Sequence, residues 1–165
     1  MMQTASVAVS IGLTLALIAA WPVANAAGLD ECRLEKLDGS GIVDPLKIPG
    51  RFLYLDFWAS WCGPCRQSFP FMNTLQAQYA ARGVTVVAIS VDKDPNEASA
   101  FLEAHPANFI VVRDVDDRCA KAMRVKGMPS SFVVTTDGRV TYSHVGFRAG
   151  DRDDIRQQLE LVSAP

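Results

Sequence analysis

The sequence predicts an α/β domain in which helices pack against a central mixed sheet. Apolar runs rich in β-branched residues alternate along the chain with helical patterns, as they do in β-α-β units. The chain has 165 residues, of which 49% are hydrophobic, and these values are ordinary for one domain with its own core. The formal net charge is only -2, so we expect no nucleic-acid partner. We also expect a monomer.

The N-terminal segment predicts export from the cytoplasm. Residues 6–28 are almost wholly apolar or small, and the first charged residue is Asp30. The Ala-Asn-Ala sequence at residues 24–26 matches the small-residue pattern of a signal-peptide cleavage site. We therefore divide the chain into a signal peptide, residues 1–26, and one domain, residues 27–165.

An uncleaved membrane anchor is the alternative for this segment. Residues 1–6 contain no Lys or Arg, which a signal peptide normally has, and the apolar stretch is long enough to span a bilayer. Pro22 would break a helix just before the small residues and favours cleavage. Either outcome places the domain outside the cytoplasm, in the periplasm.

Apolar runs and one turn motif account for the expected strands. Residues 52–57, 84–91 and 109–113 are predicted strands. The second run barely alternates in polarity, so we expect it to be buried on both faces. Residues 131–145 are predicted to form a β-hairpin with a tight turn at Asp137-Gly138.

Helical patterns fill the gaps between these strands. The first covers residues 62–82, and the second begins at Asp94, whose side chain can cap a helix that has Pro95 in its first position. The third covers residues 116–124. The last begins at Asp151 and carries three apolar residues on one face, Ile155, Leu159 and Val162.

The segment WASWCGPCRQ, residues 58–67, carries the predicted chemistry. A CxxC pair that follows a strand and opens a helix favours a redox role over a structural crosslink. Cys62 would lie at the helix N-terminus, where backbone N–H groups and the helix dipole stabilise a thiolate. Cys65 lies one turn later on the same side of the helix. We expect an exposed Cys62 to attack a substrate disulfide and a buried Cys65 to resolve the mixed disulfide.

A structural zinc site is the alternative for the cysteine pair. Zinc would need two more ligands, and no two of the candidates form a second closely spaced pair: Cys32, Cys119, His105 and His144. We therefore expect no metal site. We interpret the two histidines as surface or loop residues, and the acidic runs at 114–117 and 151–154 as helix caps.

Several motifs resemble the thioredoxin superfamily over nearly the whole predicted domain. They are FWASWCGPCR at residues 57–66, Pro70 five residues after Cys65, and VKGMPSSFVVTTDGRV at residues 125–140. The segment VVAISVDKDPNEASAFL, residues 86–102, resembles the secreted TlpA-like and ResA-like branch. The resemblance implies a thioredoxin fold, a central mixed sheet flanked by helices, with the insertion typical of TlpA-like proteins.

The resemblance also implies how a substrate would dock. In the family the proline of the second motif, here Pro129, is cis and faces the cysteine pair, and the preceding residue, here Met128, offers its backbone to an extended substrate strand. Trp61 would form a flat apolar docking surface together with Gly63 and Pro64. The structural alternatives are an ordinary strand-start proline and a core tryptophan.

Asp56 is the expected proton acceptor. It lies six residues before Cys62, a position that resembles that of the buried aspartate in cytoplasmic thioredoxins. A buried carboxylate has a raised pKa and can accept the proton of the Cys65 thiol. The sequence departs from the pattern at Ala88, where thioredoxin has a strand lysine, and at Ser68, where ResA-like proteins carry a glutamate. A solvated strand aspartate is the alternative.

Together these residues predict a periplasmic thiol:disulfide oxidoreductase that reduces protein disulfides. It needs no bound cofactor, since the electrons reside in Cys62 and Cys65. By resemblance, Gly63-Pro64 is the thioredoxin dipeptide, which belongs at the reducing end near about -270 mV, against about -120 mV for the oxidant DsbA. A reductase in an oxidising compartment requires a membrane electron donor. Apocytochrome c during cytochrome c biogenesis, an oxidase copper site and a scrambled periplasmic protein would each offer a disulfide to this surface.

Two other functions occur on related folds. A copper-delivery or oxidase-assembly module would hold Cu(I) on its thiols. Copper-carrying relatives, however, use a wider cysteine spacing and a distal histidine, neither of which is evident here. A thiol peroxidase would place its reactive cysteine in a different motif.

Cys32 and Cys119 remain when the active pair is set aside. An even number of cysteines in an exported protein favours pairing. A bond between these two would clamp the N-terminal segment onto the predicted helix at residues 116–124. The alternative is two free cysteines buried in different parts of the core.

Overall fold

The computed structural model describes residues 28–164. The predicted signal peptide or anchor, residues 1–26, lies outside the described residues. Within the part of the chain that is described, no helix combines the length and the apolar composition needed to cross a membrane.

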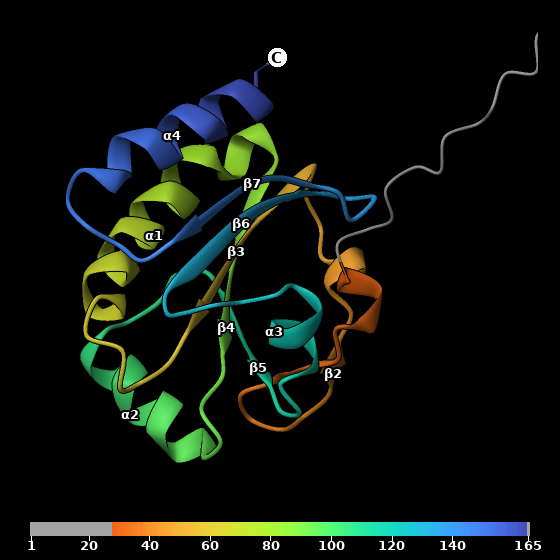
Figure 1. Cartoon of the computed structure of the whole chain (residues 1–165), viewed down its shortest axis with the longest axis vertical. Helices are drawn as coiled ribbons and strands as arrows, with labels where there is room; N and C mark the ends of the chain where they lie inside the picture. The colour runs from red at the N-terminus through yellow and green to blue at the C-terminus, as the bar shows by residue number, and fades with distance from the viewer. Residues whose placement is uncertain (1–27, 165) are drawn as a thin grey trace, which may run out of the picture.

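A seven-stranded mixed sheet runs through the centre of the molecule, in the order β2-β1-β5-β4-β3-β6-β7 (Figure 1). The three central strands β3, β4 and β5 are parallel to one another, whereas β1, β2, β6 and β7 are antiparallel to their neighbours. The bounds are β1 Leu34–Lys36, β2 Ile42–Val43, β3 Phe52–Trp58, β4 Val84–Ser90, β5 Ile110–Asp114, β6 Ser130–Thr135 and β7 Val140–Val145.

Helices cover both faces of this sheet. The α-helices are α1 Cys65–Tyr79, α2 Pro95–Ala104, α3 Arg118–Ala122 and α4 Asp151–Val162. Three short 3-10 turns are η1 Leu29–Glu31, η2 Pro45–Lys47 and η3 Ala80–Arg82. α1 and α4 lie side by side on one face, and α3 lies beside the N-terminal turns on the other (Figure 1).

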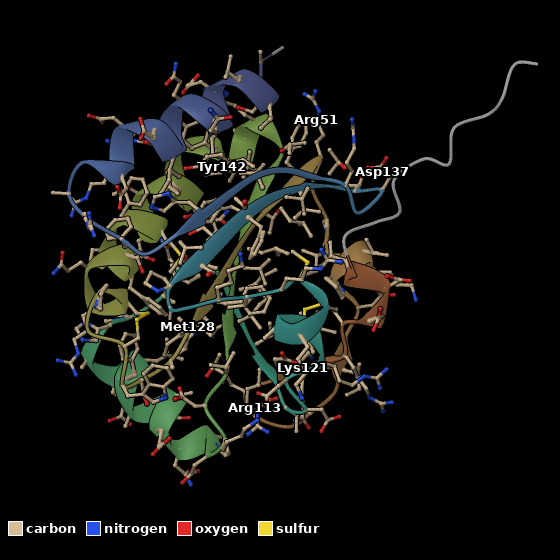
Figure 2. All side chains as sticks on the ribbon, in the orientation of Figure 1. Arg51, Arg113, Lys121, Met128, Asp137 and Tyr142 are labelled. Atoms are coloured by element: carbon tan, nitrogen blue, oxygen red, sulfur yellow. A yellow bond between two sulfur atoms is a disulfide. The ribbon has the colours of Figure 1, made fainter. Side chains whose placement is uncertain are left out.

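Strand β3 contributes to a separate core on each face. Tyr54 and Trp58 belong to the core beneath α1, α2 and α4, while Leu53, Leu55 and Phe57 belong to the core beneath η1 and α3. This alternation follows from the period of two along a strand. Side chains fill the space between the sheet and both helix layers (Figure 2). The active-site segment therefore follows a strand that is buried on both faces.

The predicted fold class, a central mixed sheet flanked by helices, is confirmed. β4 is buried along nearly all its length, as its sequence indicates. Asp94 caps α2 by accepting the N–H of Asn96 at 2.9 Å. The turn of the β6–β7 hairpin contains Gly138 at a φ of +83°, a left-handed conformation that residues with a side chain rarely adopt.

The structure departs from the prediction at the first helix, at the third helix and at the first two strands. The first helix begins at Cys65 and not at Cys62, and its last predicted turn is the 3-10 turn η3. The third helix is shorter than residues 116–124, because Asp117 and Arg124 at its two ends have φ values of 56° and 54°. The strands β1 and β2 were not predicted, since each is only two or three residues long; β1 pairs with the distant strand β5, and β2 pairs with β1.

Candidate active site

Cys62 and Cys65 form a disulfide with an S–S distance of 2.02 Å. Cys62 lies in the turn after β3, and Cys65 is the first residue of α1. The helix starts later than predicted because Gly63-Pro64 forms a turn, in which the Cys65 N–H donates to the Cys62 carbonyl at 3.2 Å. Pro64 then occupies the N-cap position with a φ of -62°.

The two cysteines differ less in exposure than expected. Cys65 is fully buried, and Cys62 keeps only 4% of its surface accessible. The prediction of an exposed Cys62 is therefore wrong for this oxidised form, in which its sulfur is bonded inward to Cys65. The Cys65 N–H also points at the Cys62 sulfur, at 3.2 Å. A helix N-terminal N–H in this position would stabilise a Cys62 thiolate once the bond is reduced.

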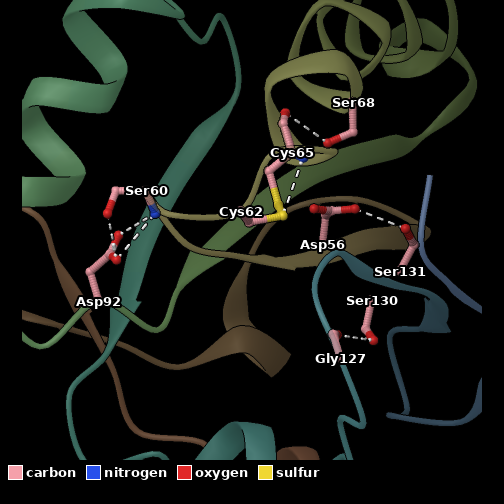
Figure 3. Close-up of a disulfide and its surroundings, with 9 residues drawn as sticks. All are labelled: Asp56, Ser60, Cys62, Cys65, Ser68, Asp92, Gly127, Ser130 and Ser131. Atoms are coloured by element: carbon pink, nitrogen blue, oxygen red, sulfur yellow. Dashed lines mark hydrogen bonds between the residues drawn. A yellow bond between two sulfur atoms is a disulfide. The ribbon is translucent and has the colours of Figure 1, made fainter. Parts of the chain in front are cut away.

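Asp56 lies on β3 and is 1% exposed. Ser131 on β6 donates a hydrogen bond to Asp56 Oδ2 at 2.8 Å, and the Tyr54 hydroxyl donates to Ser131 Oγ at 2.9 Å. Asp56 Oδ1 accepts no hydrogen bond from the described residues. In the close-up the carboxylate lies between the disulfide and Ser131 (Figure 3). One carboxylate oxygen is therefore held, and the other is unpartnered beside the cysteine pair.

Burial raises the pKa of Asp56 from 3.8 to about 7, although the Ser131 hydrogen bond acts in the opposite direction. The strand neighbour of Asp56 on β4 is Ala88, so that position supplies no cation to stabilise the charge. Burial also raises the pKa of Tyr54 well above its ordinary value, and the Asp56 charge adds to this effect. Asp56 therefore titrates near neutral pH while Tyr54 stays protonated.

In the close-up the loop before β6, with Gly127 and Ser130, lies on the same side of the disulfide as Asp56 and on the side opposite Ser60 (Figure 3). The Met128–Pro129 peptide bond is cis. Ser130 Oγ donates to the Gly127 carbonyl at 2.7 Å, and the Gly146 N–H donates to the Pro129 carbonyl at 2.7 Å. These bonds tie the loop to β6 and to the end of β7. Pro129 is buried, whereas Met128 is half-buried at the end of the loop that leads into β6 (Figure 2).

The surface next to the disulfide is apolar and open. The Trp61 side chain is 68% exposed, which excludes a core role for it. Gly63 and Pro64 are also exposed, and a side-chain carbon built at Gly63 would meet no atom within 4 Å. Large exposed apolar side chains with open space beside them are typical of protein-docking surfaces.

Asp92 is a site residue that the motif search missed. It is 3% exposed and lies just after β4, next to the strand that leads into the cysteine pair. Its carboxylate accepts the Ser60 N–H at 3.1 and 3.0 Å and the Ser60 hydroxyl at 2.9 Å (Figure 3). It also accepts the Ser90 hydroxyl at 3.0 Å. The sequence feature that could have indicated Asp92 is its position, since it is a polar residue at the carboxyl end of a central parallel strand.

Ser68 and the two histidines have surroundings that indicate no role in the chemistry of the cysteine pair. Ser68 is buried, and its hydroxyl donates to the Cys65 carbonyl at 3.1 Å. His105 ends α2 and is half-buried. The interpretation of His144 as a surface or loop residue is wrong, because it lies in β7 facing α4, with its Nε2 3.1 Å from Asp151 Oδ2.

Of the two acidic runs expected to cap helices, the run at 114–117 does so, whereas no side chain of the run at 151–154 accepts an N–H group of α4. Asp114 accepts the N–H groups of Cys119 and Ala120 at 3.2 and 2.8 Å, and so caps α3. Asp151 accepts the Arg148 N–H at 2.6 Å at the start of α4. Among residues 28–164 no group of three or more His, Cys, Asp or Glu side chains has metal-binding geometry.

A second disulfide joins Cys32 to Cys119. It connects the N-terminal segment after η1 to α3. Gly28 packs against the same helix, and a side-chain carbon at Gly28 would lie 2.7 Å from Ala122 Cβ. The N-terminal segment is thus attached to α3 by a covalent bond and by close packing.

Comparison with known proteins identifies the family. The Redoxin family profile matches residues 31–159. The chain belongs to the Redoxin family. Thiol-disulfide oxidoreductase ResA of Geobacillus thermodenitrificans is 31% identical over 113 residues, which make up 68% of this chain and 64% of that protein. ResA of Bacillus subtilis is 31% identical over 93 residues, 56% of this chain and 52% of that protein. The match thus spans less than two thirds of these Redoxin relatives.

A solved structure agrees with this assignment. A Chlorobium tepidum protein assigned as the thiol:disulfide interchange protein DsbE is 44% identical, with a TM-score of 0.72, over 79% of this chain and 91% of that one. The predicted thioredoxin-like fold is therefore confirmed for this Redoxin family member.

Proposed function

We propose that this protein is a periplasmic thiol:disulfide oxidoreductase that reduces protein disulfides. The observation that carries the proposal is the Cys62–Cys65 disulfide at the N-terminus of α1, with the unpartnered Asp56 Oδ1 beside it. The ResA and DsbE names of the similar proteins support the same chemistry. The reaction needs no bound cofactor, because two cysteine sulfurs carry both electrons.

The first step uses Cys62 in the reduced protein. Its thiolate attacks one sulfur of the substrate disulfide, so that a Cys62–substrate bond forms and the substrate S–S bond breaks. The leaving thiolate takes a proton from solvent. The Cys65 N–H beside the Cys62 sulfur favours the thiolate over the thiol and makes Cys62 the attacking residue.

The second step uses Cys65 and Asp56. The Asp56 carboxylate takes the proton of the buried Cys65 thiol, and the resulting thiolate attacks the Cys62 sulfur. The Cys62–Cys65 bond forms, and the substrate leaves with both of its sulfurs reduced. An Asp56 pKa of about 7 suits this role, since both protonation states are populated at neutral pH.

Docking in this proposal uses the two sides of the disulfide. Trp61, Gly63 and Pro64 supply a flat apolar surface. The Met128 backbone pairs with an extended substrate segment beside the buried Pro129. The Gly63-Pro64 dipeptide favours the reducing direction, and a membrane electron donor restores the dithiol in an oxidising compartment.

Turnover of insulin tests the function. The purified domain, residues 27–165, is supplied with a chemical reductant, and insulin reduction is followed by turbidity. We expect catalysis by the unmodified domain and none by Cys62→Ala. Absence of catalysis together with stoichiometric copper in the reduced protein would contradict the proposal and favour the copper-delivery alternative.

Expression of the full chain tests the location. We expect activity in the periplasmic fraction and, if the signal is cleaved, a mature N-terminus at Ala27. A full-length chain in the membrane fraction would indicate the anchor, and a cytoplasmic chain would contradict export.

A further inference from the structure

An open groove lies beside the active-site turn and is distinct from the Met128–Pro129 side. Its volume is about 600 Å³. Ser60, two residues before Cys62, and Arg66, next to Cys65, form the near wall. In the close-up Ser60 lies on one side of the disulfide, and Gly127 and Ser130 lie on the other (Figure 3). The groove thus opens on the side that the loop before β6 leaves free.

Helix α2 forms the far wall. Its exposed residues Glu97, Ala100 and Ala104 lie one turn apart along this wall, so two methyl groups and one carboxylate face the groove. Phe101 and His105 complete the lining, and their ring centroids are 4.6 Å apart. Phe101 is 7% exposed, so the apolar lining is fixed by the core beneath it.

The two walls carry opposite charges that are not neutralised internally. Within residues 28–164 neither Arg66 nor Glu97 forms an ion pair. The Asp92 carboxylate accepts hydrogen bonds from the Ser60 hydroxyl and the Ser60 N–H, so Ser60 in the near wall is fixed relative to the end of β4. A rigid apolar groove with one unpaired charge on each rim is complementary to an apolar side chain flanked by an acidic and a basic residue.

We propose that this groove binds the segment of a protein disulfide substrate that adjoins the attacked cysteine. This inference rests on the proposed function. A chain bonded to Cys62 continues in two directions from its cysteine, one toward Met128 and the other toward Arg66. The groove binds the part of the substrate chain that continues toward Arg66. A large apolar substrate side chain packs against Phe101 and Ala100. An acidic substrate residue pairs with Arg66, and a basic one pairs with Glu97.

Two peptide disulfides test the groove. Each peptide carries one cysteine as a mixed disulfide with thionitrobenzoate. The first has leucine, glutamate and lysine within three residues on both sides of the cysteine, and the second has serine and glutamine at those positions. The reduced domain reduces each disulfide as Cys62 and Cys65 become oxidised, and release of thionitrobenzoate gives kcat/KM. We expect the first peptide to react about tenfold faster, equivalent to about 1.4 kcal/mol.

Filling the groove should remove this preference. Ala100→Trp and Ala104→Trp place a large side chain in it at two positions, and far-UV circular dichroism shows which of them folds. The matched control is Ala77→Trp, at an exposed position near the far end of α1. We expect the ratio of the two rates to fall to about one in either groove variant and to be retained in the control.

The outcomes separate the groove from the chemistry. If the unmodified protein reduces both peptides and every variant keeps the same preference between them, the groove proposal is overturned and the proposed function stands. Unmodified protein that reduces neither peptide overturns the proposed function and the groove with it. Loss of the preference in Ala77→Trp as well would assign it to another surface and overturn the groove.

Discussion

Ser131 donates its hydroxyl proton to Asp56 across the antiparallel pair β3–β6, with 2.8 Å between Oγ and Oδ2. Tyr54 donates to the same Ser131 oxygen, so the serine hydroxyl is fixed as a donor toward the carboxylate. The bond orients Asp56 and moderates the rise in its pKa that burial causes. Asp56 can therefore act as a base at neutral pH although it is buried.

Asp56→Asn should slow release of the mixed disulfide. Asparagine cannot accept the Cys65 proton, and general bases contribute about 100-fold or more to such steps. We expect the first attack by Cys62 to be little changed. Rapid-quench analysis, with alkylation of thiols and mass spectrometry of the mixed disulfide, separates the two rates. A pH–rate profile identical to that of the unmodified protein would remove Asp56 from the mechanism.

Ser131→Ala should shift the pH dependence of the same step. Removing the donor disfavours the charged carboxylate, so the Asp56 pKa rises further and the base form appears at higher pH. A hydrogen bond to a charged group contributes about 1.5 kcal/mol or more, which corresponds to about one pH unit. The midpoint of the release rate against pH measures the shift, and a midpoint that stays or falls would contradict the proposed coupling.

Asp56 should also lower the stability of the fold at high pH. Its pKa rises from 3.8 in the unfolded chain to about 7 in the folded one, so the folded state binds more protons between these values and loses stability as the pH rises. The full penalty, on the order of 4 kcal/mol, is present above neutral pH and absent under acid conditions.

Denaturation of Asp56→Asn at several pH values measures this penalty. The gain in unfolding free energy should be near zero at about pH 4 and largest at about pH 8. Asp116→Asn, at an exposed position, provides the control and should show no such trend. A gain that is independent of pH would mean that Asp56 does not carry the charge in question.

The cysteine roles predict two different trapping results. Cys65→Ala should accumulate mixed disulfides with substrate proteins, because the attacking thiol remains and the resolving thiol is gone. Cys62→Ala should accumulate none, since Cys65 is fully buried. Non-reducing gels of protein taken from cells after acid quenching give the result, and the reverse pattern would exchange the two assignments.

The local signals of the sequence were sufficient for most of the fold. Apolar runs locate β3, β4 and β5, and Asp94 with Pro95 locates the start of α2. The first strands β1 and β2 have no comparable signal, because each has only two or three residues, and β1 joins the sheet by pairing with the distant β5 while β2 pairs with β1. The start of α1 moved to Cys65 because the Gly63-Pro64 turn precedes the helix, which the CxxC spacing alone does not reveal.

The site was predictable where its residues belong to one motif. The motif names Cys62 and Cys65, whereas Ser131 reaches Asp56 only through the register of β3 and β6, a separation of 75 residues. Asp92 reaches Ser60 through the packing of β4 beside β3, a separation of 32 residues. Such contacts depend on strand register, and a single sequence carries no direct record of it.

Asp92→Asn should loosen the turn that precedes the active cysteine. The Asp92 carboxylate accepts from the Ser60 N–H, the Ser60 hydroxyl and the Ser90 hydroxyl, and an amide has only one acceptor oxygen for them. We expect a loss of about 2 kcal/mol in unfolding free energy. A double-mutant cycle with Ser60→Ala should give a coupling of about 1 kcal/mol, and additive effects would show that the pair does not interact.

The Cys32–Cys119 bond should stabilise the fold without taking part in turnover. It closes a loop with a sequence separation of 87 residues, for which the chain-entropy estimate is about 4 kcal/mol. The Cys32→Ala/Cys119→Ala double variant should lose stability on that order in urea, whereas its reduction of a small disulfide under native conditions should be unchanged, because the bond lies on the face of the sheet opposite α1.

Thiol counting on the unmodified protein provides the complementary measurement. Native oxidised protein should contain no free thiol, and mild reductant should release two, from Cys62 and Cys65. The Cys32–Cys119 peptide should survive this treatment, because structural disulfides of exported proteins resist reductants that open a redox-active pair. Two free thiols outside the active pair before reduction would show that the Cys32–Cys119 bond is absent. Release of the Cys32 thiol by mild reductant would show that this second bond is redox-active.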